Sequence, residues 1–386
     1  MGNSSLQIIA ENVSVIASPK TWIEGGAIQQ LQTTAKLPGM HRVVGMPDLH
    51  PGRGYPVGAA FFSIGRFYPA LIGGDIGCGM RLLKTDLSIA KISLDKLVKR
   101  LGNIDAPLIE QSDVWRERVR SFQLQDSGFE QSLGTIGGGN HFAEIQQIIE
   151  VFDQDIFSAH GLDRKQVMLL VHSGSRGLGG HILREHIDQF GHLGLAEDDT
   201  AAIAYWQQHQ QALDFALCNR RLIAERICAN LATDAETVLD IHHNFLSEVS
   251  IDGVRGFIHR KGAAPADEGL IVIPGSRGDY SFVVQAVRGE LASHSLFSLA
   301  HGAGRKWMRS ECEARLKQRY TAAQLSRTAL DSRVVCHDKG LIFEEAPEAY
   351  KPIDSVITSL QEAGLIKVVA KLKPLISYKT SGGCCV

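Results

Sequence analysis

The sequence predicts a mixed α/β fold, one large domain whose cleft is lined by tight loops. Short apolar runs of strand character alternate with longer stretches of helical character, and each of these runs enters or leaves a glycine-rich segment. No repeat, linker or low-complexity block interrupts the chain. We therefore expect a single domain over residues 1–386, with a short flexible tail at about 381–386.

The first predicted elements are two helices on either side of a strand. Leu94–Leu101 follows Ser93, a residue type that commonly caps the start of a helix. The run VMLLVHS at 167–173 is short and apolar, which is typical of a buried strand. Asp199–Ala232 is rich in Ala, Gln and Arg and places its apolar residues at helical spacing, so we expect a long helix there.

Two strands and two helices are expected in the rest of the chain. GLIVIPG at 269–275 and SFVVQAV at 281–287 are short apolar runs separated by a glycine-containing turn. Lys306–Tyr320 and Ile353–Gly364 have the composition and spacing of helices.

The overall composition excludes several classes of protein. With 44% hydrophobic and 21% charged residues the chain can bury a core, so it is not a disordered protein. It has no run of ~18 apolar residues that would predict a membrane span. Its seven cysteines form no CxxC pair, and we expect a reduced, cytoplasmic protein. Because Lys and Arg (40) nearly balance Asp and Glu (42), any site for an anion must be local.

Glycine makes up 39 of the 386 residues, above the usual ~7%. The glycines gather in segments that also hold His, Asp, Cys, Asn or Arg, and a glycine lets backbone approach a ligand closely. The segments are 47–58, 73–80, 134–145, 172–181, 259–269, 273–281 and 301–305. Seven such segments are hard to explain as turns alone, so we expect them to line the cleft.

A metal site is one prediction from these segments. Asp75 and Cys78 lie three residues apart in a glycine-flanked loop, and a carboxylate with a thiolate suits a divalent transition ion. His141 and His243 each adjoin an asparagine, and His172 ends a predicted strand just before a glycine segment. Their imidazoles could converge on the same point. The spacing alone leaves open two ions bridged by the thiolate, one ion, or none.

A phosphate site is the second prediction. HGAGR at 301–305 precedes the helix expected from Lys306, and backbone N–H groups at a helix start bind anions. His301 could act there as a general acid, a ligand or a nucleophile, with Arg305 and Arg309 stabilising phosphate charge. Other polar residues near these segments could contact a nucleotide; they are Asn140, Glu144, Asn244, Ser276, Ser281 and, as a flexible cation in a polar tail, Lys379.

The motifs resemble those of a known family. DLHPGRGYPVG, GGDIGCGM, GGGNHFAEI, HSGSRGLG, HHNF, HRKGAAPADEGLIVIPGS, SLAHGAGR and AYKPID occur in this order. Together they are similar to the RtcB family of RNA ligases, from Asp48 to Lys379. The resemblance implies a single α/β domain built on packed β-sheets with surrounding helices.

The resemblance also implies an activity and a metal arrangement. Members of this family are GTP- and Mn(II)-dependent ligases that join an RNA 3′-phosphate or 2′,3′-cyclic phosphate to a 5′-hydroxyl. Carried over, Cys78, His141 and His172 hold one of two Mn(II) ions. Asp75, Cys78 and His243 hold the other, with Cys78 bridging.

The same resemblance assigns the nucleotide and RNA positions. His301 corresponds to the histidine that becomes guanylylated before the guanylate passes to the RNA 3′-phosphate. Positions matching nucleotide contacts are Asn140, Glu144, Asn244, Pro274, Gly275, Ser276, Ser281, Gly302, Ala303, Gly304 and Lys379. Candidates for handling the RNA ends are His50, Arg176, Arg305 and Arg309.

The chain also departs from the family pattern. The terminal Lys-Gly of the family is replaced by Lys379-Thr380, and Arg277 stands where Met is commoner. HGAGRKWMRS, with Trp307, is similar to the branch coupled to release factor H, which implies RNA repair and a functional link to the ribosome. We expect a monomer without a membrane partner.

Two other functions remain open from the sequence. One is a binuclear metallophosphoesterase acting on RNA or nucleotide ends, in which His301 is only a ligand or an acid. The other is an RNA- or ribosome-binding protein that kept the fold, although pure binding does not need so complete a set of metal ligands.

Overall fold

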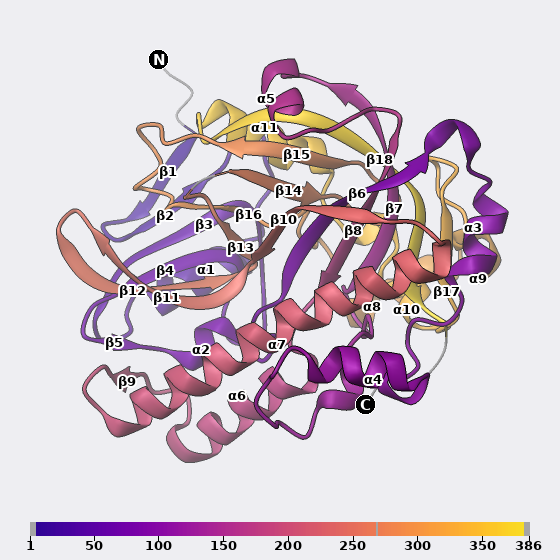
Figure 1. Ribbon diagram of the computed structural model, residues 1–386. Helices are drawn as coiled ribbons and strands as arrows, with labels where there is room; N and C mark the ends of the chain where they lie inside the picture. Colours follow the sequence, from indigo (N-terminus) through magenta and orange to yellow (C-terminus); the bar gives the residue numbers. More distant parts are fainter. Residues whose placement is uncertain (1–4, 268, 382–386) are drawn as a thin grey trace.

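Two large β-sheets form the framework of the protein (Figure 1). The computed structural model describes residues 5–267 and 269–381. In spatial order, the strands of the six-stranded sheet are β1 (Leu6–Ala10), β2 (Val13–Ile16), β3 (Met40–His50), β4 (Val57–Ser63), β12 (Val254–Lys261) and β11 (Asn244–Ile251).

The eight-stranded sheet carries most of the candidate site. In spatial order its strands are β10 (Ala235–His242), β6 (Gly79–Ser88), β8 (Gln166–Ser173), β7 (Phe142–Val151), β18 (Ile366–Thr380), β15 (Ser281–Ala286) and β14 (Leu270–Pro274), with β17 (Arg333–Cys336) paired to β18. Short pairs are formed by β13 (Ala263–Pro265) with β16 (Ser298–Ala300) and by β5 (Arg66–Phe67) with β9 (Leu195–Ala196).

Apolar side chains from the two sheets meet in one core. Val44 and Phe62 of the smaller sheet pack in the same buried cluster as Ile273 and Val284 of the larger one. This burial is what alternating apolar positions on facing strands predict. The packed sheets confirm the mixed α/β fold with packed sheets that we expected.

Helices surround the sheets. They are α1 (Gly25–Thr34), α2 (Pro69–Ile72), α3 (Leu94–Leu101), α4 (Asp113–Arg120), α5 (Gln154–Ala159), α6 (Gly177–Phe190), α7 (Thr200–Leu231), α8 (Arg309–Leu316), α9 (Ala322–Leu325), α10 (Leu341–Glu344) and α11 (Ile353–Glu362). None of the helices in the described ranges is long and apolar enough to cross a membrane.

The long helix α7 lies against the eight-stranded sheet (Figure 1). The side chain of Asp199 accepts a hydrogen bond from the N–H of Ala201 and caps the start of the helix. Ile223 and Ile227, one turn apart, pack in a buried cluster with Leu169 of β8. The sequence therefore placed this helix correctly from its apolar spacing.

Along one edge of the larger sheet, the last residues of β10 and β8 lie beside the first residues of β6 and β7. Because β10, β6, β8 and β7 pair antiparallel, the end of one lies beside the start of the next. Gly79 at the start of β6 pairs with His242 of β10 and with Ser173 of β8. Phe142 at the start of β7 pairs with His172. Segments far apart in the sequence are thereby brought to one edge.

Two sequence predictions about local structure are wrong. The helix expected over Lys306–Tyr320 is shorter, because the backbone N–H groups of Lys306 and Trp307 donate to the carbonyl of Ala349 instead. The glycine loop at 301–305 therefore does not lead directly into a helix. Lys379 does not lie in a polar tail: it belongs to β18, which accommodates Pro374 beside a bulge. Of the flexible tail expected at 381–386, residues 382–386 lie outside the described residues.

We expect Gly77→Ala to destabilise the fold by about 2–4 kcal/mol, since it combines two costs. Gly77 has a φ of +73°, and an added Cβ would lie 2.7 Å from Cβ of Ala216 on α7. Gly253→Ala is the matched control, because Gly253 has a φ of +80° but nothing within 4 Å of an added Cβ. That variant should cost only about 1 kcal/mol of backbone strain. Urea denaturation of both variants measures the difference, and equal losses would contradict the predicted packing of α7 against this loop.

Candidate active site

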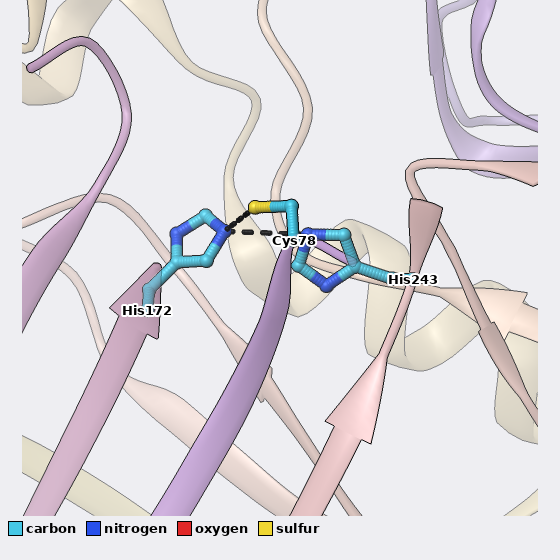
Figure 2. Close-up of side chains that lie close together, drawn as sticks. All are labelled: Cys78, His172 and His243. Atoms are coloured by element: carbon cyan, nitrogen blue, oxygen red, sulfur yellow. Dashed lines mark hydrogen bonds between the residues drawn. The ribbon is translucent and has the colours of Figure 1, made fainter. Parts of the chain in front are cut away.

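The five residues predicted to bind metal converge at the row of strand ends. Cys78 Sγ lies 3.1 Å from His172 Nε2 and 3.4 Å from His141 Nε2. His172 Nε2 is 3.3 Å from His243 Nε2, and Figure 2 shows these two rings and the thiol facing one another. His141 Nε2 is 3.1 Å from Asp75 Oδ2. We call these five residues the ligand cluster.

The ligand cluster divides into two overlapping groups that share Cys78. One is Cys78, His172 and His243, and the other is Asp75, Cys78 and His141, with the potential ligand atoms of each group within 4.8 Å of one another. The resemblance also implied a shared thiolate, but it paired His141 with His172 and Asp75 with His243. The structure brings all five expected residues together, but it groups His172 with His243 and His141 with Asp75.

The electrostatics of the ligand cluster suit a cation. Burial, together with the neighbouring histidines, lowers the pKa of His172 and of His243 well below the ordinary value, so both rings are neutral. Burial and the Asp75 carboxylate raise the pKa of the Cys78 thiol well above its ordinary value. Neutral imidazoles, a sulfur and a carboxylate that all face one point are the donors that a divalent transition ion prefers.

His301 lies next to the ligand cluster and faces a cavity of about 680 Å³. Its ring centroid is 4.8 Å from that of His243. His301 Nδ1 lies 2.7 Å from Oδ2 of Asp48, a fully buried carboxylate that the sequence analysis did not single out. This contact occupies Nδ1 and leaves Nε2 as the ring nitrogen that does not face Asp48.

Asp48 is itself held in place by its surroundings. The buried Lys351 donates from Nζ to the carbonyl of Leu49 at 2.7 Å and to that of Pro47 at 3.2 Å. Because Gly304 has no side chain, the 301–305 loop can pack against β3, the strand that carries Asp48. An added Cβ at Gly304 would lie 2.2 Å from the carbonyl oxygen of Asp48. The motifs DLHPGRG and AYKPID contained these residues, but their pairing was not visible in the sequence.

Most of the predicted nucleotide contacts line the cavity. They are Asn140, Asn244, Pro274, Gly275, Ser276, Gly302, Ala303, Gly304 and Lys379. Glu144 and Ser281 are buried outside the set of lining residues, and Gln146 Nε2 donates to both of them at 2.8 and 2.9 Å. Burial raises the pKa of Glu144 to about 7, although hydrogen bonds from Ser377 and Gln146 oppose that rise.

The candidates for RNA ends divide in the same way. His50, Arg305 and Arg309 line the cavity. Burial lowers the pKa of His50 to about 4, so its ring is neutral. Arg176 lies outside the lining set, and its Nε donates to Thr135 Oγ1 at 3.2 Å.

A buried carboxylate that the sequence analysis missed organises the cationic wall of the cavity. Glu345 accepts hydrogen bonds from Tyr350 at 2.6 Å, from Arg305 at 3.1 Å and from Lys379 at 3.3 Å. It also forms an ion pair with Arg309 at 2.9 Å. Burial would raise the pKa of Glu345, but the three cations outweigh it and lower the pKa to about 2. Arg309 also lies 3.6 Å from the carboxylate of Glu344, so three cations face two carboxylates and an excess of positive charge remains.

Comparisons with known proteins cover the whole site. The family model described as "tRNA-splicing ligase RtcB" matches residues 30–120 and 104–380. The chain is 55% identical to "RNA-splicing ligase RtcB2" of Escherichia coli over 97% of each protein. It is 28% identical to "tRNA-splicing ligase RtcB" of Archaeoglobus fulgidus, with 92% of this chain and 91% of the relative covered. It is 29% identical to "RNA-splicing ligase RtcB" of Mycobacterium tuberculosis, with 90% and 99% covered.

We expect the two buried glutamates to give opposite pH dependences of stability. Glu345 has a pKa of about 2, below the ordinary 4.5, so its contribution is complete above 4.5 and is lost as the pH falls towards 2. Glu345→Gln should therefore cost about 3 kcal/mol near neutral pH and progressively less in acid.

Glu144 is the matched control, because its pKa is raised from 4.5 to about 7. Its favourable contribution is present below 4.5 and is lost as the pH rises towards 7, so Glu144→Gln should become relatively more stable over that range. Urea denaturation at a series of pH values measures both slopes. Parallel slopes in the two variants would contradict the assigned environments.

Proposed function

The chain belongs to the RtcB family of RNA ligases, and from that premise we propose that it is a GTP- and Mn(II)-dependent RNA ligase. In this proposal it joins RNA 3′-phosphate or 2′,3′-cyclic phosphate ends to 5′-hydroxyl ends. His301 carries the guanylate as a covalent intermediate, and an RNA-(3′)pp(5′)G end forms next.

One observation carries the mechanism. His301 lies in the wall of the cavity with Nδ1 bonded to Asp48, which leaves the Nε2 lone pair for attack. In the first step the bond from Nε2 to the α-phosphorus of GTP forms as the bond to pyrophosphate breaks. Nδ1 keeps its hydrogen throughout, and the Asp48 carboxylate stabilises the positive charge that develops on the ring.

The ligand cluster is the proposed metal centre. Asp75, Cys78, His141, His172 and His243 would hold two Mn(II) ions, with Cys78 in both groups. Bound Mn(II) would supply positive charge beside the phosphate oxygens, which favours displacement at phosphorus. The short distance between the rings of His243 and His301, 4.8 Å between centroids, supports a metal centre beside the proposed nucleophile.

In the remaining steps of the proposal, the RNA phosphate groups react beside the cationic wall of the cavity. An RNA 3′-phosphate oxygen attacks the phosphorus on His301, the P–N bond breaks, and Nε2 regains its lone pair. The 5′-hydroxyl then attacks the RNA phosphorus, loses its proton to the surrounding solution, and GMP departs. The excess positive charge around Glu345, from Arg305, Arg309 and Lys379, favours binding of these phosphate groups.

The biological setting of the proposal is the cytoplasm, in RNA repair or tRNA splicing. The resemblance around Trp307 to the branch coupled to release factor H favours repair. Joining rates for cleaved tRNA and for cleaved ribosomal RNA, measured side by side, distinguish these substrates.

We expect His301→Ala to abolish both the covalent guanylate and the joining of RNA ends. Incubation with Mn(II) and GTP labelled at its α-phosphate measures the adduct as acid-labile radioactivity on the protein. A labelled adduct of undiminished yield in His301→Ala would refute this mechanism. An adduct-free wild-type protein that instead hydrolyses RNA phosphate ends would favour a metallophosphoesterase.

Asp48→Asn should retain the fold but slow formation of the guanylate by roughly 10²–10⁴-fold. An amide in place of the carboxylate favours the wrong tautomer of His301 and does not stabilise the charged ring. Single-turnover labelling measures the rate, and the melting temperature serves as the control for folding. A rate equal to that of the wild type would contradict the role of Asp48.

A further inference from the structure

The ligand cluster is assembled from four separate segments of the chain. Asp75 and Cys78 lie in the loop before β6, and His141 lies directly before β7. His172 is the penultimate residue of β8, and His243 directly follows β10. Backbone pairing aligns these strand ends in one row, but each ligand sits at or beyond the end of its strand. Something besides the sheet must fix the distances between them.

Arg220 on α7 joins three of these segments through one side chain. Its guanidinium is fully buried. Nη1 donates to the carbonyl of Gly77 at 2.7 Å and to that of Ser173 at 3.1 Å, the residues next to Cys78 and His172. Nε donates to Oδ1 of Asp240 at 2.7 Å, on the strand that leads to His243.

Arg220 makes further contacts on β10, and one of the residues it contacts there also bonds the loop that carries Cys78. Oδ1 of Asp240 also lies 2.6 Å from Nη2 of Arg220, so two guanidinium nitrogens face the same carboxylate oxygen. His242, which precedes His243, lies 3.3 Å from Nη2 and directs its Nδ1 to the carbonyl of Gly77 at 2.8 Å. Through these contacts the Arg220 guanidinium holds the loop that carries Cys78 against β10, the strand that precedes His243.

The preceding residue, Asn219, adds the fourth segment. Its Oδ1 accepts from the N–H of Gly134 at 2.8 Å, at the start of the glycine loop that leads to His141. Its Nδ2 donates to Ser173 Oγ at 3.0 Å and to the carbonyl of Gly174 at 3.1 Å. Asn219 is fully buried like Arg220.

We propose that Asn219 and Arg220 are positioning residues for the metal centre, setting the spacing of the ligand cluster without touching the metal. This inference rests on the proposed function, since it takes the ligand cluster to be a metal site. These two neighbouring, fully buried residues of one helix contact all four ligand-bearing segments. They bond the backbone beside Cys78, after His172 and at the start of the loop before His141, and the Asp240 side chain on the strand before His243. Because these contacts are made by side chains of α7, the geometry of the centre depends on how that helix packs.

The test is Arg220→Lys, which keeps the charge but has no planar fork to span Gly77, Ser173 and Asp240. We expect its Mn(II) dissociation constant, measured by equilibrium dialysis, to rise by about 10–100-fold, as for other residues that orient metal ligands. Co(II) in place of Mn(II) should show a weaker or shifted thiolate absorption band. Joining activity should be restored towards the wild-type rate by saturating Mn(II).

Arg226→Lys is the matched control. Arg226 lies on the same helix, is also buried, and donates to the carbonyls of Asn103, Ile104 and Ala106, which lie outside the ligand-bearing segments. It also donates to the carbonyl of Gly134, but Asn219 still holds the N–H of that residue in the Arg226→Lys variant. It should lose stability to urea much as Arg220→Lys does, yet keep its Mn(II) affinity within about twofold of the wild type. If Arg220→Lys does not fold, Asn219→Asp serves instead: it keeps an acceptor for Gly134 and loses the donor to Ser173 and Gly174.

The outcomes separate this inference from the proposed function. Wild-type protein that binds no Mn(II) would overturn the proposed metal centre itself. Wild-type binding with an unchanged dissociation constant in the folded Arg220→Lys or Asn219→Asp variant would overturn only the positioning role. An equal loss of affinity in Arg226→Lys would also overturn it, because the loss would then reflect general destabilisation of α7.

Discussion

The antiparallel register of β10, β6, β8 and β7 is the constraint on which the rest of the site depends. It places the ends of four strands in one row, so that Cys78 and three histidines from distant parts of the chain can face one another. A shift of one residue in the pairing of β8 would turn His172 to the opposite face of the sheet. Gly79 allows β6 to lie close to β10 at this edge, since an added Cβ would lie 2.3 Å from the carbonyl oxygen of Ile241.

The pairing of buried charges around the cavity and the ligand cluster is the second organising feature. Asp48 pairs with His301, Asp240 accepts from Arg220, and Glu345 forms ion pairs with Arg305, Arg309 and Lys379. Breaking one such pair leaves an uncompensated charge, which is more costly than the pair itself is favourable. The arrangement therefore fixes side-chain positions around the cavity more than it contributes net stability.

The sequence predicted what depends on local pattern and on motif. The spacing of apolar residues located α7. The glycine segments contained four of the five ligand-cluster residues and His301, and the fifth, His243, lies in the HHNF motif. It did not predict features that depend on pairing between distant segments. The backbone of 305–307 pairs with 349–350 and so delays α8 to Arg309, and Lys379 is drawn into the sheet as part of β18. Asp48 and Glu345 were missed because nothing in the local sequence shows which cation a buried carboxylate will meet.

The position of β18 also has a consequence for biosynthesis. This strand is the last in chain order within the described residues, yet it lies inside the eight-stranded sheet, between β7 and β15. A nascent chain therefore lacks the strand that joins the two halves of this sheet until residues 366–380 have been made. Contacts over such long separations form slowly. The sheet that carries the ligand row is thus completed only at a late stage of synthesis, and a partly made chain exposes two unpaired strand edges to its surroundings.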